Sequence, residues 1–167
     1  MSEPAASPRP FAWWILTFFG SGASPVAPGT AGSLAAVAVA GGLFAAGVPA
    51  GVWFGGLAVG MALLHLAVGD RIEEVFGTHD PGAVVSDEVC GQWIAFAFPL
   101  AAVPWGWALP LGFILFRIFD ITKIGGVRRL EKIPGKWGVL LDDVLAGLYA
   151  GVILWGLGTT GVFDGTL

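Results

Sequence analysis

Charged side chains stand at the edges of two strongly apolar stretches in the C-terminal half of this chain. Arg117, Asp120 and Lys123 follow one another at spacings of three residues, and Asp142 and Asp143 precede the last apolar stretch. Only 12% of the residues are charged, and carboxylates at a membrane border are costly and commonly mark a functional site. Together with two other polar clusters, this pattern suggests a membrane-bound, metal-dependent phosphatase.

A second group of carboxylates precedes the apolar stretch 89–103. Asp80, Asp87 and Glu88 offer the hard oxygen ligands that Mg²⁺ takes, with water and substrate phosphate completing its shell. The dipole of a following helix also stabilises carboxylates at its start, so Asp87 and Glu88 have a purely structural explanation too. His79 is either an aid to proton transfer or an ordinary loop residue.

The Gly-rich segment 20–33 is a candidate phosphate-binding element. Pro25 and Pro28 end any preceding helix, and Thr30 or Ser33 can cap the helix that follows. Such a turn presents free backbone N–H groups and the positive end of a helix dipole, which suits a phosphate. An ordinary loop and cap is the alternative. The residues expected to contact phosphate are Gly29, Thr30, Gly32 and Ser33.

The composition indicates an integral membrane protein. The chain has 167 residues, of which 56% are hydrophobic, and its mean hydropathy is +0.81. A soluble domain has roughly a quarter of its residues charged, about twice the share found in this chain. The net charge of −4 does not suggest a nucleic-acid partner, and no basic run with interleaved aromatics is present, so we expect none. The single cysteine, Cys90, excludes an internal disulfide and is predicted to be a small core residue.

The apolar stretches predict an all-α, polytopic membrane helical bundle with about five spans. The predicted spans are 33–48, 52–68, 89–103, 105–119 and 144–157. A span needs roughly 20 apolar residues, so the polar ends of the short third and fourth spans must reach the headgroup region. A short interfacial helix within 11–19 precedes them, anchored by Trp13 and Trp14. We expect one membrane-embedded domain, 11–160, between a disordered tail, 1–10, and a C-terminal tail, 161–167.

The charges fit this threading of the chain. Residues 70–143 hold ten of the twelve acidic residues and seven of the eight basic ones. Five spans place the segment 20–33 and the loops 69–88 and 120–143 on one side, and the two uncharged turns on the other. By the positive-inside rule the charged side is cytoplasmic, so all three polar clusters are predicted to face the cytoplasm.

Carboxylates and cations on one membrane face suggest phosphoryl chemistry at the level of the lipid headgroups. A carboxylate-held Mg²⁺ would neutralise phosphate oxygens, while Arg117 and Lys123 stabilise the charge that develops on them. Structural ion pairs of Asp120 with Arg117 or Lys123 are the simpler alternative. A small transporter or channel with a carboxylate-lined site is another, although its polar groups would be expected near the bilayer midplane.

Three sets of residues resemble motifs of the phosphatidylglycerophosphatase A family, bacterial enzymes of the inner membrane. They are Ser24-Pro25 through Pro28-Gly29-Thr30 to Gly32-Ser33; His79-Asp80-Pro81, Asp87-Glu88 and Gly91-Gln92-Trp93; and Phe116-Arg117-Ile118-Phe119-Asp120, Lys123, Gly138, Asp142-Asp143 and Ala146-Gly147. The sets follow one another in the family order over roughly residues 16–155.

The resemblance implies Mg²⁺-dependent removal of the terminal phosphate from phosphatidylglycerophosphate, with membrane lipids as the surroundings and an active site facing the cytoplasm. It leaves open which carboxylates bind metal and the oligomeric state. The expected catalytic residues are Asp87, Arg117, Asp120, Lys123 and Asp143. The expected metal ligands are drawn from Asp80, Asp87, Glu88, Asp120, Asp142 and Asp143.

Overall fold

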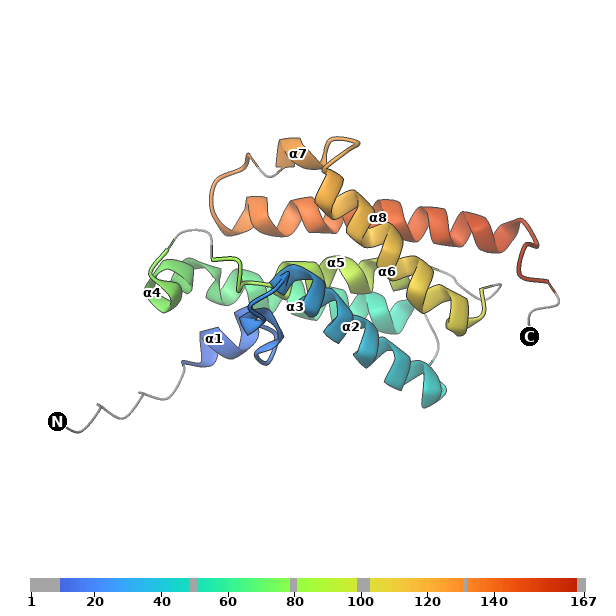
Figure 1. The fold of residues 1–167 in the computed structure, drawn as a ribbon, viewed down its shortest axis with the longest axis horizontal. Coiled ribbons are helices and arrows are strands. Elements are labelled where there is room, and N and C mark those ends of the chain that lie inside the picture. Colours follow the sequence, from blue (N-terminus) through green and yellow to red (C-terminus); the bar gives the residue numbers. More distant parts are fainter. Residues whose placement is uncertain (1–9, 49–50, 79–80, 99–102, 131, 165–167) are drawn as a thin grey trace.

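The computed structural model describes residues 10–48, 51–78, 81–98, 103–130 and 132–164, and it contains no strand within these ranges (Figure 1). The α-helices are α1 (Phe11–Leu16), α2 (Pro28–Ala45), α3 (Val52–Val68), α4 (Ile72–Phe76), α5 (Ser86–Phe96), α6 (Trp105–Thr122), α7 (Val127–Leu130) and α8 (Lys136–Thr159). Two short 3₁₀ helices are η1 (Ser21–Ala23) and η2 (Gly69–Arg71). The predicted all-α fold is confirmed.

Four of the described helical segments are long and apolar enough to cross a membrane. They are α2, α6, α8 and the continuous stretch Val52–Phe76, which comprises α3, η2 and α4. Large apolar side chains such as Leu63, Trp105 and Val152 are exposed on their outer faces, as expected where lipid replaces water. The predicted membrane bundle is confirmed, with four spans by this measure where the sequence suggested about five.

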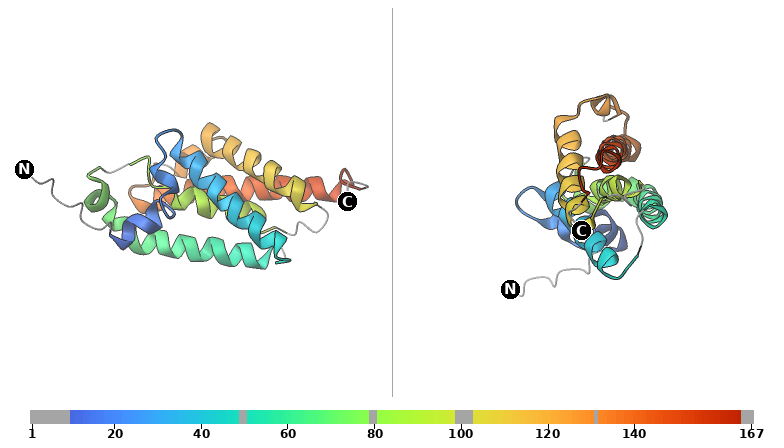
Figure 2. Two further views of the ribbon diagram at one scale, coloured as in Figure 1. Left: turned by 60° about the horizontal axis from the view of Figure 1, so that its bottom comes forward. Right: turned by 90° about the vertical axis from the view of Figure 1, so that its right-hand side faces the viewer.

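The third predicted span, 89–103, forms a shorter helix than expected. The helix α5 is 11 residues long, and nine of these residues are buried. It packs against α8, α3, α2 and α6, and Figures 1 and 2 show it lying between α3 and α8. Because neighbouring helices enclose α5, its apolar residues form part of the protein core instead of a lipid-facing surface.

Two helices begin earlier than the sequence suggested. The first residue of α2 is Pro28, because a proline in the first turn lacks only an N–H group that would have no helical partner there. The helix α8 begins at Lys136, so Asp142 and Asp143 lie in its second turn and do not precede it. This longer α8 brings both carboxylates alongside α5.

The polar ends of several helices meet in one region of the bundle. The start of α5, the end of α6 and the first turns of α8 all lie toward the end that carries α4 and α7 (Figure 1). Lys123 adopts a left-handed conformation with φ of 53°, which ends α6 and turns the chain toward α7. The described residues of the second and third polar clusters therefore lie at one end of the structure, as predicted.

Candidate active site

Three carboxylates from two helices come together in the interior. Asp87 and Glu88 lie in the first turn of α5, and Asp143 lies in the second turn of α8. One ligand oxygen from each lies within 4.8 Å of the other two. Among the described residues, no donor reaches Asp87 Oδ1, Glu88 Oε2 or Asp143 Oδ1, although all three atoms are buried. Buried carboxylate oxygens normally have partners, so this carboxylate trio is incomplete as protein alone.

The carboxylate trio fits a hard divalent cation. Burial is the largest influence on Asp87 and Glu88, and it raises the pKa of both carboxyl groups above their ordinary values. Carboxylates this close cannot all carry charge in a low-dielectric interior unless a cation lies between them. Several carboxylate oxygens of this kind are the ligands that Mg²⁺ and Ca²⁺ prefer. Asp87, Glu88 and Asp143 are therefore the residues that could hold a metal ion.

A lysine bridges two further carboxylates beside the trio. Lys123 Nζ forms an ion pair with Asp142 Oδ2 and lies 3.4 Å from Asp120 Oδ1. Burial by itself lowers the pKa of Lys123. The hydrogen bond to Asp142 and the charges of Asp142, Asp143 and Asp120 outweigh burial, so the pKa is raised above its ordinary value. Lys123 is therefore a fixed positive charge at the edge of the carboxylate trio.

Arg117 contacts both Asp120 and the α2 residue Ser33. Its Nη1 atom lies 2.6 Å from Asp120 Oδ2, and it also donates a long hydrogen bond of 3.4 Å to Ser33 Oγ. Ser33 Oγ in turn donates to the carbonyl oxygen of Gly29 at 2.9 Å. Arg117 thus ties the end of α6 to the start of α2 and orients Asp120.

The start of α2 lies against Glu88. A Cβ added to Gly29 would stand only 2.1 Å from Glu88 Oε1 and 3.3 Å from Arg117 Nη1. The positive end of the α2 dipole therefore faces a carboxylate of the protein. Gly32 packs against Val85 in the same way, with a Cβ contact of 2.5 Å.

A histidine connects the first residues of α5 and α8, the two helices that carry the carboxylate trio. His65 Nδ1 lies 2.8 Å from Ser86 Oγ, and Nε2 lies 3.2 Å from the carbonyl oxygen of Lys136. Because a carbonyl only accepts, Nε2 carries the proton and Nδ1 accepts from the Ser86 hydroxyl. His65 thus joins α3 to the first residue of α5 and the first residue of α8.

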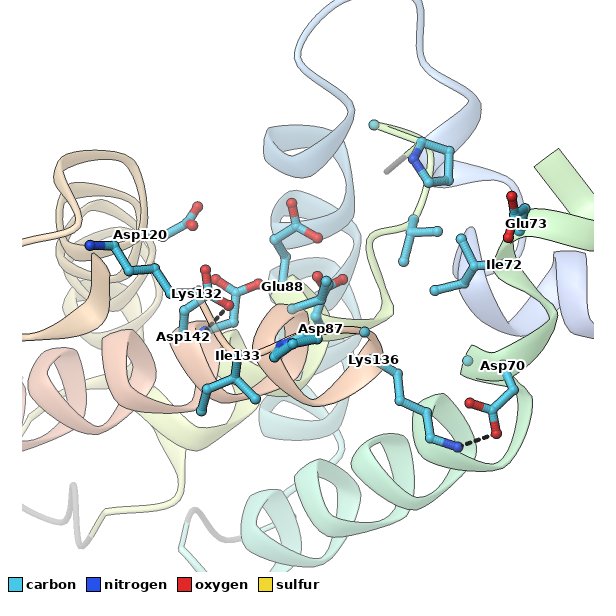
Figure 3. Close-up of a pocket in the computed structure, with 18 of the residues that line it drawn as sticks. Asp70, Ile72, Glu73, Asp87, Glu88, Asp120, Lys132, Ile133, Lys136 and Asp142 are labelled. Atoms are coloured by element: carbon cyan, nitrogen blue, oxygen red, sulfur yellow. Dashed lines mark hydrogen bonds and ion pairs between the residues drawn. The ribbon is translucent and has the colours of Figure 1, made fainter. Parts of the chain in front are cut away.

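A cavity of about 580 Å³ opens onto these groups. In Figure 3, Asp87 and Glu88 lie between Asp120 and Asp142 on one side and Asp70 on the other. The cavity is lined by Asp87, Glu88, Asp120, Lys123, Asp142 and Asp143 from the polar clusters, by Gly69, Asp70, Ile72, Glu73, Pro81, Gly82 and Val84, and by 132–136 with Val139. Seven carboxylates and three lysines line it, so a bound cation would be needed to make it favourable for an anionic group.

Some of the predicted site residues form the carboxylate trio, others line the same cavity, and others lie outside it. The carboxylate trio contains Asp87, Glu88 and Asp143, whereas Asp120 and Asp142 line the same cavity in ion pairs with cations. Asp80, a predicted ligand, lies outside the described residues, as does His79. The predicted phosphate-binding residues Gly29, Thr30, Gly32 and Ser33 do not line the cavity, and neither does Arg117. Glu88 and Arg117 lie against the α2 start, and phosphate binding by these four residues stays a prediction.

One buried polar residue was named from the sequence only as part of a family motif and was not assigned to the site. Gln92 lies one helical turn after Glu88, has no exposed surface, and has no partner for either amide atom among the described residues. A glutamine within an otherwise apolar predicted span was the available signal. Because it lies one turn from Glu88 on the same helix, Gln92 forms part of the surroundings of the site.

Comparison with known proteins gives consistent results. A sequence model of the phosphatidylglycerophosphatase A family matches residues 14–158. A curated Escherichia coli protein named phosphatidylglycerophosphatase A is 35% identical over 151 residues, which cover 87% of this chain and 83% of that protein. A Haemophilus influenzae protein of the same name is 41% identical over 85 residues, covering 48% of this chain and 49% of that protein.

A further relative carries a different name. A Bacteroides thetaiotaomicron protein, whose name proposes phosphatidylinositol-3-phosphatase activity, is 42% identical over 146 residues, covering 84% of this chain and 89% of that protein. No solved structure matches the chain.

Proposed function

Because the chain belongs to the phosphatidylglycerophosphatase A family, we propose that it hydrolyses the terminal phosphomonoester of phosphatidylglycerophosphate. Water adds to phosphorus, the bond from phosphorus to the glycerol oxygen breaks, and that oxygen gains a proton. The products are phosphatidylglycerol and inorganic phosphate. The observation that carries the proposal is the carboxylate trio of Asp87, Glu88 and Asp143 on the wall of a cavity. One buried oxygen of each lacks a hydrogen-bond partner among the described residues.

Asp87, Glu88 and Asp143 would hold a divalent cation, for which we propose Mg²⁺. When bound there, such an ion neutralises negative charge on the phosphate oxygens and orients the phosphoryl group for attack. The burial of the three carboxylates strengthens their hold on a cation, because their charges are weakly screened by solvent.

We propose that Lys123 contacts the phosphate and that Asp120 helps to position Lys123. Lys123 lines the cavity, and its protonated Nζ would stabilise the charge that develops on the phosphate oxygens. Asp142 and Asp120 hold the ammonium group in place. Arg117 does not line the cavity, so we propose that it acts through Asp120 as a positioning residue and does not touch the substrate.

The name of the Bacteroides thetaiotaomicron relative suggests a second candidate substrate. Its name concerns phosphatidylinositol 3-phosphate, which also carries a phosphomonoester on a polyol headgroup. The identity of 42% favours testing this lipid alongside phosphatidylglycerophosphate. Both reactions use the same hydrolytic step, so they differ in headgroup recognition.

We propose that the protein resides in a bacterial inner membrane with the cavity facing the cytoplasm. Seven of the eight basic residues lie within 70–143, and the described ones among them lie toward the cavity end of the bundle. The positive-inside rule assigns such an end to the cytoplasm. Labelling of single cysteines introduced near each end, with a membrane-impermeant reagent on intact cells, tests this orientation.

The test of function is phosphate release by the purified, full-length protein from a panel of lipid phosphates, with Mg²⁺ and after chelation. We expect release from phosphatidylglycerophosphate that depends on the cation and disappears in Asp87→Asn and Asp143→Asn. The matched control is Asp164→Asn, an exposed aspartate that does not line the cavity, and it should retain wild-type activity.

Full activity of both cavity variants would overturn the assignment of the site. Absence of phosphate release from every lipid, together with solute movement in liposomes, would instead support the transporter alternative. That alternative predicts polar groups near the midplane, whereas Asp87 and Glu88 lie in a first helical turn and Asp120 lies in a last one.

A further inference from the structure

The cavity extends beyond the carboxylate trio to a lysine that the proposed hydrolysis does not use. Lys132 lines the cavity from the segment between α7 and α8, and its side chain is exposed. No ion pair or hydrogen bond of its ammonium group with another described residue is found. Figure 3 shows Lys132 on the side of Asp142, away from Asp70.

The other two lysines that line the described part of the cavity are occupied. Lys123 is paired with Asp142 and Asp120. Lys136 lies 2.5 Å from Asp70 Oδ2 and donates to the carbonyl oxygen of Leu66 at 2.8 Å. Lys132 is therefore the cation of this cavity that is available to a second anionic group.

The opposite wall disfavours an anion. Asp70 and Glu73 line it from η2 and α4, and Asp70 is paired with Lys136. Like charges at short range repel, so a second phosphate would be directed away from this wall and toward Lys132.

The backbone next to Lys132 is held against α8. The Ile133 amide donates to the carbonyl oxygen of Leu130 at 2.9 Å. The Ile133 carbonyl oxygen lies so close to Gly138 that an added Cβ would stand 1.9 Å from it. This contact requires glycine and sets the position from which the Lys132 side chain extends.

Apolar side chains beside Lys132 indicate the headgroup level of the membrane. Ile133, the next residue, and Trp137, in the first turn of α8, are 38% and 50% exposed. Tryptophan is enriched at membrane–water interfaces, and lysine side chains extend from such positions toward lipid phosphates. The phosphate that joins a lipid headgroup to its diacylglycerol lies at this level.

We propose that Lys132 binds the phosphodiester of the substrate and so selects lipids that carry both a phosphodiester and a phosphomonoester on one polyol. This inference rests on the proposed function, and it places the monoester at the carboxylate trio and the diester at the mouth of the cavity. Phosphatidic acid has a monoester alone, so Lys132 would give it no comparable contact.

The test compares wild type, Lys132→Gln and Lys132→Arg in mixed micelles. Phosphatidylglycerophosphate is the substrate, and phosphatidic acid is a competitor that reports binding whether or not it is hydrolysed. We expect Lys132→Gln to raise KM about fivefold with little change in kcat, the size of effect that one exposed ion pair gives. The inhibition constant of phosphatidic acid should stay within about twofold, and Lys132→Arg should restore KM.

The matched control is Arg129→Gln, which removes an exposed cation three residues away that does not line the cavity. It should leave KM at the wild-type value. An unchanged KM in Lys132→Gln, or an equal weakening of phosphatidic acid, would overturn the role of Lys132. Failure of the wild-type protein to hydrolyse phosphatidylglycerophosphate would overturn the proposed function itself, so the two failures are distinguishable.

Discussion

The carbonyl oxygen of Asp143 lies so close to Gly91 that a Cβ on Gly91 would stand 2.5 Å from it. One turn further along α8, a Cβ on Gly147 would stand 2.2 Å from the carbonyl oxygen of Gly91. These contacts allow the backbones of α5 and α8 to touch, as small residues commonly do in membrane helix pairs. They set the distance between Asp87 on one helix and Asp143 on the other.

Gly91→Ala is therefore expected to separate α5 from α8, lower the thermal unfolding temperature and remove most phosphatase activity. Overpacking a close contact typically costs about 1–3 kcal/mol. Thermal unfolding in detergent and phosphate release measure the two effects. Gly156→Ala is the control, because no described atom lies within 4 Å of its added Cβ. Wild-type stability and activity in Gly91→Ala would contradict this account of the helix contact.

Gly29→Ala is expected to reduce activity with little loss of stability. The added Cβ meets the carboxylate end of Glu88, a flexible side chain that can move aside at small energetic cost. Its movement would disturb the carboxylate trio, so phosphate release should fall about tenfold or more, as for other small displacements in active sites. Gly42→Ala, in the same helix with no described atom within 4 Å, should leave activity unchanged. Equal activity of the two variants would show that Glu88 is not required in its present position.

The main helices and the polar end of the bundle could be predicted from sequence because apolar length and charge distribution determine both. The starts of α2 and α8 were less predictable, since Pro28 and Lys136 continue helices beyond the apolar residues. The burial of α5 depends on how other helices pack around it, which hydropathy alone does not encode.

For the carboxylate trio too, the sequence predicts one part of the arrangement and the packing of the helices determines the other. Asp87, Glu88 and Asp143 were recognisable as candidate ligands by type and position. Which carboxylates form the trio and which, like Asp120 and Asp142, form ion pairs depends on distances between helices that the sequence does not give. The α2 start was predicted to attract an anion through its helix dipole, and nothing in the sequence indicated that Glu88 would lie close to it.

Arg117→Lys is expected to lower kcat about tenfold or more while changing KM little. Arg117 contacts both Asp120 and Ser33 through its Nη1 atom, a position at the far end of the side chain that the shorter lysine side chain cannot reach. Hydrogen bonds to charged groups contribute about 1.5–3 kcal/mol, which corresponds to this loss. Steady-state kinetics separate kcat from KM. Arg128→Lys, an exposed arginine in α7, is the control. A rise in KM alone would indicate direct substrate contact and contradict a positioning role.

A divalent cation is expected to raise the thermal unfolding temperature of the wild-type protein but not that of Asp143→Asn. A ligand at 100 times its Kd stabilises the folded state by about 2.7 kcal/mol when it binds only that state. Without the cation, Asp143→Asn should unfold at the wild-type temperature or higher, because it removes one of three mutually repelling carboxylates. Unfolding of chelator-treated protein, titrated with Mg²⁺, Mn²⁺ or Ca²⁺, measures both effects, and Asp164→Asn should behave as wild type. Equal stabilisation of Asp143→Asn would exclude the carboxylate trio as the cation site.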